Sequence, residues 1–183
     1  MKRLFHRAKI AKYANISKDI EFSHSKDRLI IRSDVINVFK KYEQKSEADE
    51  SGGILLGYVY KDRTEIVKVS VPGSLDSFAK NFFIRSKINA QGLINKSWGK
   101  SKGTLIYVGE WHTHPEKNPT SSIVDKGMIK KTLIETKMEI NFLYLIIVGQ
   151  NDTYWVGKQT KNKLLELVRR KAWGQAATEG SLT

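Results

Sequence analysis

The order of apolar and polar positions predicts alternating strands and helices. Runs of β-branched and aromatic residues are typical of strands and are expected at 29–31, 54–60, 65–71, 81–84, 104–112, 140–148 and 153–157. Apolar positions three and four apart are typical of helices and are expected at 33–45, 86–94, 122–136 and 160–170, with Ser33 as a helix N-cap. The class is therefore mixed α and β.

Turn residues separate these segments and give the chain its organisation. The polar turn Lys61-Asp62-Arg63 joins two strand patterns and predicts a hairpin. The three prolines all lie between patterned segments, and no internal repeat is present. We expect one α/β domain over 26–171, a basic N-terminal extension over 1–25 and a flexible tail over 172–183. Residues 98–103 are expected to form a loop within the region from Pro72 to Gly103, where the pattern is mixed.

Composition narrows the chemistry. With 183 residues and 40% hydrophobic content, the chain can bury the core of one domain. The sequence contains no cysteine, which excludes disulfide scaffolds, thiolate metal sites and a cysteine nucleophile. The longest apolar run, 140–148, is far shorter than the roughly 20 residues of a membrane span. The N-terminus has no apolar signal core, so we expect a cytoplasmic protein with no membrane partner.

The chain is strongly basic, with 32 Lys and Arg against 19 Asp and Glu and a net charge of +13. This balance favours acidic partners. The basic residues form loose clusters rather than a stripe, at 2–12, 96–102 and 158–171. A solvated basic surface is the simpler interpretation, and nucleic-acid binding is a minor alternative.

Two histidines stand one residue apart at the end of the strand predicted before Pro115. Alternate side chains of a strand leave on the same face, so His112 and His114 can converge while Trp111 and Thr113 face the other way. A His-x-His pair alone is weak evidence for a metal, because such pairs are more often solvated or packed.

The next helix is expected to begin with Ser122-Ile123-Val124-Asp125. Ser-x-x-Asp predicts a capping box, in which Ser122 and Asp125 close free backbone N–H groups. Because residues three apart share a helix face, both side chains could also point toward the histidines. Two imidazoles and one carboxylate from His112, His114 and Asp125 suit zinc and leave a fourth position for water, as a catalytic site requires.

Hydrolysis of an amide also needs a base, and a free carboxylate must supply it. The candidates are Glu47, Asp49, Glu50, Glu110 and Glu116. Glu110 shares the parity of the histidines, whereas Glu116 lies in a loop and is expected to be solvated. Glu50 precedes Gly52 and Gly53, and glycines allow another backbone to come close. Spacing alone does not choose among these acids.

Together these residues resemble a known family. Glu50-Ser51-Gly52-Gly53, then Gly109-Glu110-Trp111-His112-Thr113-His114-Pro115, then Ser122-Ile123-Val124-Asp125 match the motif of the JAMM (MPN+, JAB) metallo-isopeptidases in residues and spacing. The resemblance covers roughly 29–170. It implies a JAB/MPN-type, cytidine-deaminase-like fold, in which a curved mixed sheet is flanked by helices.

The resemblance also implies a role for each residue. His112, His114 and Asp125 would bind one zinc ion per chain, Glu50 would be the general base and acid, and Ser122 would hold the developing oxyanion. Each role is chemically sound, since hydrolysis needs a Lewis acid, a proton carrier and a donor to the anionic oxygen. Glu110 becomes a neighbour that would orient a histidine.

Within the family, the chain looks like the deconjugating peptidases of bacterial CBASS anti-phage operons. The implied activity is zinc-dependent cleavage of the bond after the C-terminus of a ubiquitin-like protein or of a CBASS nucleotidyltransferase joined to a target. The implied partners are that C-terminal tail, bound along a sheet edge, and a conjugating enzyme. The alternatives are a peptidase of another ubiquitin-like or sulfur-carrier pathway, and a non-catalytic MPN scaffold.

Overall fold

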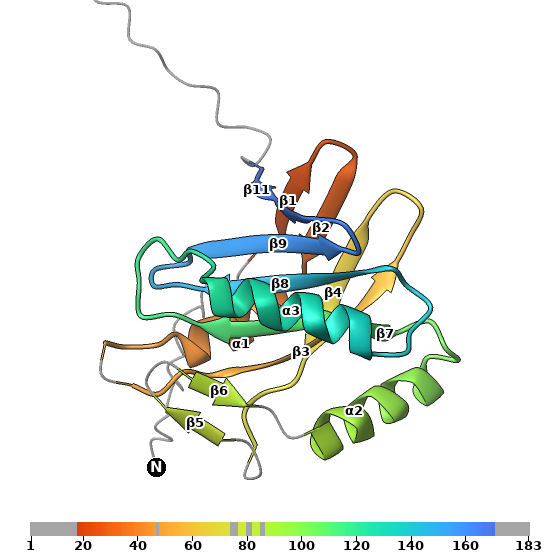
Figure 1. Ribbon diagram of the computed structural model, residues 1–183, viewed down its shortest axis with the longest axis horizontal. Coiled ribbons are helices and arrows are strands. Elements are labelled where there is room, and N and C mark those ends of the chain that lie inside the picture. Colours follow the sequence, from red (N-terminus) through yellow and green to blue (C-terminus); the bar gives the residue numbers. More distant parts are fainter. Residues whose placement is uncertain (1–17, 47, 74–76, 80–81, 85–86, 171–183) are drawn as a thin grey trace, which may run out of the picture.

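The computed structural model describes residues 18–46, 48–73, 77–79, 82–84 and 87–170. Three helices and eleven strands follow one another in this part of the chain (Figure 1): β1 Ile20–His24, β2 Asp27–Ile31, α1 Ser33–Tyr42, β3 Gly52–Val59, β4 Thr64–Val69, β5 Ser77–Ala79, β6 Phe82–Ile84, α2 Lys87–Lys100, β7 Ile106–Thr113, α3 Ile123–Glu135, β8 Phe142–Val148, β9 Tyr154–Thr160, β10 Leu164–Glu166 and β11 Val168–Arg169.

Nine strands form one curved sheet in the order β10-β9-β8-β7-β3-β4-β2-β1-β11. The β2–β4 and β7–β8 pairs are parallel and the other pairs are antiparallel, including the predicted β3–β4 hairpin. The two ends of the sheet are consecutive in the chain, because β10 pairs with β9 and β11 pairs with β1. The segment from Leu164 to Arg169 therefore nearly closes the sheet upon itself.

This closing segment corrects one prediction. The helix expected at 160–170 is wrong, since these residues end β9 and form β10 and β11. The amide of Leu167 donates to the carbonyl of Val156, and the amide of Arg170 donates to that of Glu21. Leu167 is buried in the core between the two short strands. Pairing with distant strands thus decides the conformation of a segment whose local pattern also fits a helix.

The N-terminal boundary of the domain is also different. The prediction of an extension through residue 25 is wrong for β1, which pairs with β2 along its whole length. The predicted N-cap at Ser33 is wrong as well, because Arg32 occupies the cap and makes no side-chain cap bond. Asp19 instead accepts a hydrogen bond from the Ser33 amide at 2.7 Å. Residues 1–17 and 171–183, with most of the predicted extension and the predicted tail, lie outside the described residues.

The region between β4 and β7 contains more regular structure than the pattern predicts. β5 and β6 form a separate two-stranded sheet. α2 continues to Lys100, so the loop predicted from Trp98 is wrong for its first three residues. A turn follows the helix and ends at Gly103, whose amide donates to the carbonyl of Trp98 and whose φ of 86° favours glycine.

Two hydrophobic clusters cover the two faces of the large sheet. α1 packs one cluster through Val35, Ile36 and Phe39. α2 and α3 cover the other face, with Ala90 and Ile129 buried there. Figure 1 shows α3 crossing one face of the sheet and α1 behind it. The predicted single α/β domain with a curved sheet flanked by helices is confirmed. None of the helices in the described ranges could span a bilayer.

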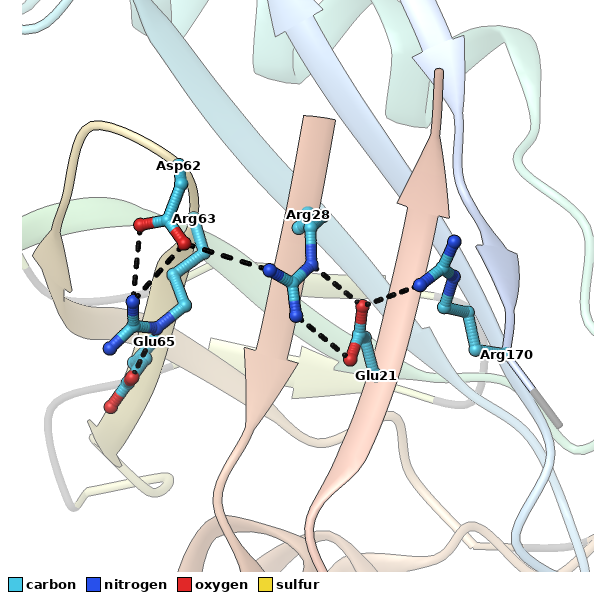
Figure 2. A network of polar contacts seen from close by, with 6 residues as sticks. All are labelled: Glu21, Arg28, Asp62, Arg63, Glu65 and Arg170. Atoms are coloured by element: carbon cyan, nitrogen blue, oxygen red, sulfur yellow. Dashed lines mark hydrogen bonds and ion pairs between the residues drawn. The ribbon is translucent and has the colours of Figure 1, made fainter. Parts of the chain in front are cut away.

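A chain of ion pairs ties the closing strands together on the outer surface (Figure 2). We call this chain the seam network; its charges alternate in the order Arg170, Glu21, Arg28, Asp62, Arg63 and Glu65. Glu21 accepts two hydrogen bonds from Arg28, at 2.9 and 3.3 Å. The network joins β1, β2, the β3–β4 turn and the residue after β11.

Candidate metal centre

The end of β7 presents the two histidines on one face. His112 is 4% exposed and His114 is partly exposed. The rings lie 5.1 Å apart between centroids. The neighbours Trp111 and Thr113 are buried on the opposite side, as strand alternation predicts, and Trp111 belongs to the cluster under α1.

The start of α3 supplies the carboxylate. Ser122 is the N-cap, and the predicted capping box is confirmed. The Asp125 amide donates to the Ser122 hydroxyl oxygen at 3.1 Å, and the Ser122 amide donates to Asp125 Oδ2 at 2.7 Å. Since this bond uses one carboxylate oxygen, it fixes the other, Oδ1, toward β7. The cap thus holds Asp125 in place facing the histidines.

The three side chains form one group. Potential ligand atoms of His112, His114 and Asp125 all lie within 4.8 Å of one another. Nε2 of His112 lies 3.2 Å from Asp125 Oδ1, and Nε2 of His114 lies 3.8 Å from Asp125 Oδ2. His112 Nε2 is buried and has no hydrogen-bonding partner in acceptable geometry. A buried ring nitrogen that faces a carboxylate without a hydrogen bond fits a pair of atoms that share a cation.

The surroundings of Asp125 and His114 favour their unprotonated forms. Burial alone would raise the pKa of Asp125, but His112 and the Ser122 hydrogen bonds outweigh it and hold that pKa well below its usual range. Burial and the nearby His112 lower the pKa of His114. An ionised carboxylate and a neutral imidazole are the forms that bind a metal. The set of two nitrogens and one oxygen fits zinc with one position left open.

Glu50 approaches the same group from β3. Gly52 pairs with His112 in the β3–β7 ladder, so Glu50 precedes β3 beside the end of β7. The expected close backbone approach is present at Gly53, where a Cβ would lie 2.4 Å from the Ser70 carbonyl oxygen. Burial raises the pKa of Glu50, His112 opposes this and Asp125 adds to it. Glu50 is therefore a desolvated acid in the field of two of the proposed ligands.

Thr113 is a residue whose importance the sequence did not reveal. It stands between the two histidines in the sequence and is fully buried. Its hydroxyl accepts a hydrogen bond from the Ser51 amide at 2.9 Å and donates one to Gln44 Oε1 at 3.2 Å. The Thr113 amide also donates to the Ser51 carbonyl at 2.8 Å. Gln44 in turn donates to the Ala48 carbonyl. Thr113 thus anchors the segment that carries Glu50. The only signal in the sequence was a polar residue at a position facing the core.

The other candidate acids have different surroundings. Glu110 accepts a hydrogen bond from the Tyr107 hydroxyl at 2.9 Å, so its role in orienting a histidine stays a prediction. Glu116 is exposed, as expected for the loop, with Oε2 4.0 Å from His114 Nδ1. Asp49 is exposed. Glu47 lies outside the described residues.

Comparison with known proteins settles the family. A family model described as prokaryotic homologs of the JAB domain matches residues 32–159, a range that includes every residue of the site. The chain belongs to this prokaryotic JAB family. The resemblance inferred from the motif is therefore confirmed. The fold of this chain is similar to the solution structure of protein DSY2949 from Desulfitobacterium hafniense, with a TM-score of 0.54 and 16% sequence identity. The match covers 74% of this chain and 87% of that one.

Curated relatives are similar to this chain over most of its length. A protein named CD-NTase/cGAS isopeptidase from Escherichia coli (strain TW11681) is 32% identical over 145 residues, which is 79% of this chain and 90% of the relative. A protein of the same name from Vibrio cholerae serotype O1 is 30% identical over 145 residues, or 78% and 90% of the two chains. The similarity thus extends over almost the whole length of both relatives.

Proposed function

We propose that this JAB protein is a zinc-dependent isopeptidase that releases a CD-NTase from the target to which its C-terminus is joined, within bacterial CBASS defence. The observation that carries the proposal is the site itself. Potential ligand atoms of His112, His114 and Asp125 lie within 4.8 Å of one another, and Glu50, a desolvated carboxylate that is not among them, interacts with two of these residues. The relatives named CD-NTase/cGAS isopeptidase support this choice of substrate.

The three ligands and Glu50 have separate tasks in this proposal. Zinc held by His112, His114 and Asp125 would supply Lewis acidity to the scissile carbonyl and to a water molecule. Glu50 accepts a proton from the attacking water and passes it to the nitrogen of the leaving lysine as the C–N bond breaks. Burial raises the pKa of Glu50 and so brings it closer to neutral pH, which suits a group that first accepts a proton and then donates it.

Ser122 is suited to stabilise the negative oxygen that forms on the former carbonyl. Its hydroxyl oxygen accepts the Asp125 amide within the cap, which leaves the hydroxyl hydrogen to donate. The cap also holds this hydroxyl beside the metal ligand. A donor fixed in advance at this point needs no rearrangement when the charge appears.

The test of this proposal compares two neighbouring carboxylates, in Glu50→Gln and Asp49→Asn. Zinc is measured by mass spectrometry, and cleavage is followed on a CD-NTase C-terminal tail joined to a lysine side chain. We expect about one zinc ion per chain in both variants. Cleavage should fall about 10²- to 10⁴-fold in Glu50→Gln, the usual contribution of a general base, and remain unchanged in Asp49→Asn.

The two readouts separate the parts of the proposal. Glu50→Gln cleaving at the wild-type rate would contradict the base assignment. A wild-type protein that binds zinc but cleaves no tail conjugate would favour the non-catalytic scaffold. A wild-type protein without zinc that still cleaves would contradict the metal site.

A further inference from the structure

A second polar site lies at the other end of the sheet. A pocket of about 240 Å³ opens between α2, β3 and β4, and its lining residues are Tyr58, Lys68, Lys96, Ser97, Lys100, Ser101 and Leu105. Two of the lysines belong to the basic cluster at 96–102, for which the proposed isopeptidase activity has no use. Gly52, opposite His112, and Tyr58 stand near the two ends of β3, roughly 20 Å apart at the usual rise per residue. The pocket is therefore separate from the candidate metal centre.

All polar side chains of this pocket can donate hydrogen bonds, and none is a carboxylate. Lys68 donates to the Ser97 hydroxyl at 3.4 Å, and this serine is only 4% exposed. In the part of the chain that the structure describes, no acidic side chain pairs with Lys68, Lys96 or Lys100. Other basic residues nearby are neutralised, as Arg63 is by Asp62 and Glu65. Three ammonium groups around one opening, with no acidic partner among the described residues, favour an anion of more than one charge.

Aromatic surface adjoins the charged part of the pocket. The ring of Tyr58 lies 6.4 Å from that of Tyr60, and the Arg63 guanidinium lies 4.4 Å from the centroid of the Tyr60 ring. Tyr60 is 45% exposed. Rings beside cationic groups are the combination that binds nucleotides, since a base stacks while its phosphate pairs with lysine.

We propose that this pocket binds a phosphate-bearing ligand of nucleotide size. The phosphate lies among Lys68, Lys96 and Lys100, and the ring system lies against Tyr58. A phosphate monoester carries a charge of about −1.5 to −2 near pH 7, which matches the surplus of positive charge. The pocket is a binding site in addition to the proposed isopeptidase centre and does not depend on it.

The experiment titrates the zinc-loaded full-length protein with AMP, adenosine or inorganic phosphate and follows the backbone amides by two-dimensional NMR. AMP is chosen because it competes weakly for zinc. We expect AMP to shift the amides of Ser97, Ser101 and Leu105, adenosine to have no effect, and inorganic phosphate to bind more weakly than AMP. In Lys96→Gln/Lys100→Gln the dissociation constant for AMP should rise about tenfold or more.

The matched control is Lys130→Gln/Lys161→Gln, which removes the same charge from exposed lysines elsewhere. An equal loss of affinity in the control would mean that net charge alone attracts AMP and would overturn the proposal. Shifts centred on Thr113 would place the phosphate at the metal centre and overturn it too. Inorganic phosphate binding as tightly as AMP would overturn the role of Tyr58. Binding of a ten-residue oligothymidylate but not of AMP would overturn the nucleotide-sized ligand.

Discussion

Glu50 and Glu21 are the same residue type in opposite surroundings. Glu21 lies in the seam network, where the Arg28 hydrogen bonds lower its pKa. Glu50 lies beside the candidate metal centre, where burial raises its pKa. Glu21 has a guanidinium partner on each side, Arg28 and Arg170. Among the described residues, no Lys or Arg forms an ion pair with Glu50.

This difference distinguishes a carboxylate that stabilises the fold from one suited to proton transfer. A fully paired carboxylate is stabilised in its ionised form and has little tendency to take up a proton. A desolvated carboxylate has a raised pKa and takes up a proton more readily. Asp125 follows the first pattern, since His112 and the Ser122 hydrogen bonds hold its pKa below the usual range. Mutations at the two regions should therefore affect different measurable properties.

The largest effect is expected at Asp125, which has one role in the metal site and another in the helix. In Asp125→Ala both roles are lost, whereas Asp125→Asn keeps an oxygen that can accept the Ser122 amide. We expect zinc content and cleavage to fall to background in both variants, because the charged ligand is gone. Only Asp125→Ala should also lose about 1 kcal/mol of folding free energy through the cap. Zinc analysis and thermal denaturation measure the two effects.

The control for this prediction is Ser122→Ala, which removes the cap hydroxyl and leaves all three ligands. It should keep its zinc. Wild-type zinc content in Asp125→Asn would show that the carboxylate charge is not needed. The proposed ligand set would then be wrong at its third member.

A smaller effect is expected at Thr113, which is not a member of the proposed metal-binding set. Thr113→Val has the same shape but removes the hydroxyl that accepts from the Ser51 amide and donates to Gln44 Oε1. We expect zinc to be retained and cleavage to fall about 10- to 100-fold, as is usual when a supporting contact of a metal site is lost. The loss should appear in kcat, since Thr113 positions Glu50 and does not bind substrate. Cleavage and zinc content are measured on the same preparation.

Thr64→Val is the matched control, since Thr64 is also buried and accepts a hydrogen bond from the Tyr144 hydroxyl at 3.3 Å. Each variant should lose about 1–3 kcal/mol of stability by leaving buried polar groups unpaired. Only Thr113→Val should lose activity per folded molecule. Equal activity in the two variants would mean that Thr113 stabilises the core but does not position Glu50.

The sequence predicted those parts of the site that depend on local geometry. The parity of His112 and His114 follows from one strand, and the capping box follows from one helix start. Their meeting point required a contact between β7 and α3 that no spacing reveals. The choice of Glu50 over Glu110 likewise depended on the register between β3 and β7, which residue patterns do not specify. The family resemblance supplied that choice.

The errors in the fold have the same origin. Residues 160–170 fit a helix locally, but their backbone groups pair with β9 and β1. The contact of Thr113 with Gln44 spans 69 positions. β1 was missed although its main partner, β2, is the next strand, because residues 20–24 have no strong periodic pattern of their own. Non-local pairing therefore limits what the pattern predicts, at the sheet closure as at the site.

The smallest effect is expected in the seam network. Glu21→Gln should leave cleavage unchanged and lower the melting temperature by about 1–3 °C at neutral pH, because partly exposed ion pairs contribute little. Since the folded pKa of Glu21 is below its ordinary value of 4.5, its contribution is complete above that pH and is lost as pH falls through the folded pKa. The difference between wild type and variant should therefore shrink toward pH 3 and in 1 M salt.

Glu135→Gln, which breaks a single exposed pair with Lys131, should show almost no difference at any pH. A gap that widens on acidification would mean that Glu21 is stabilised in its protonated form, which would remove the contrast with Glu50.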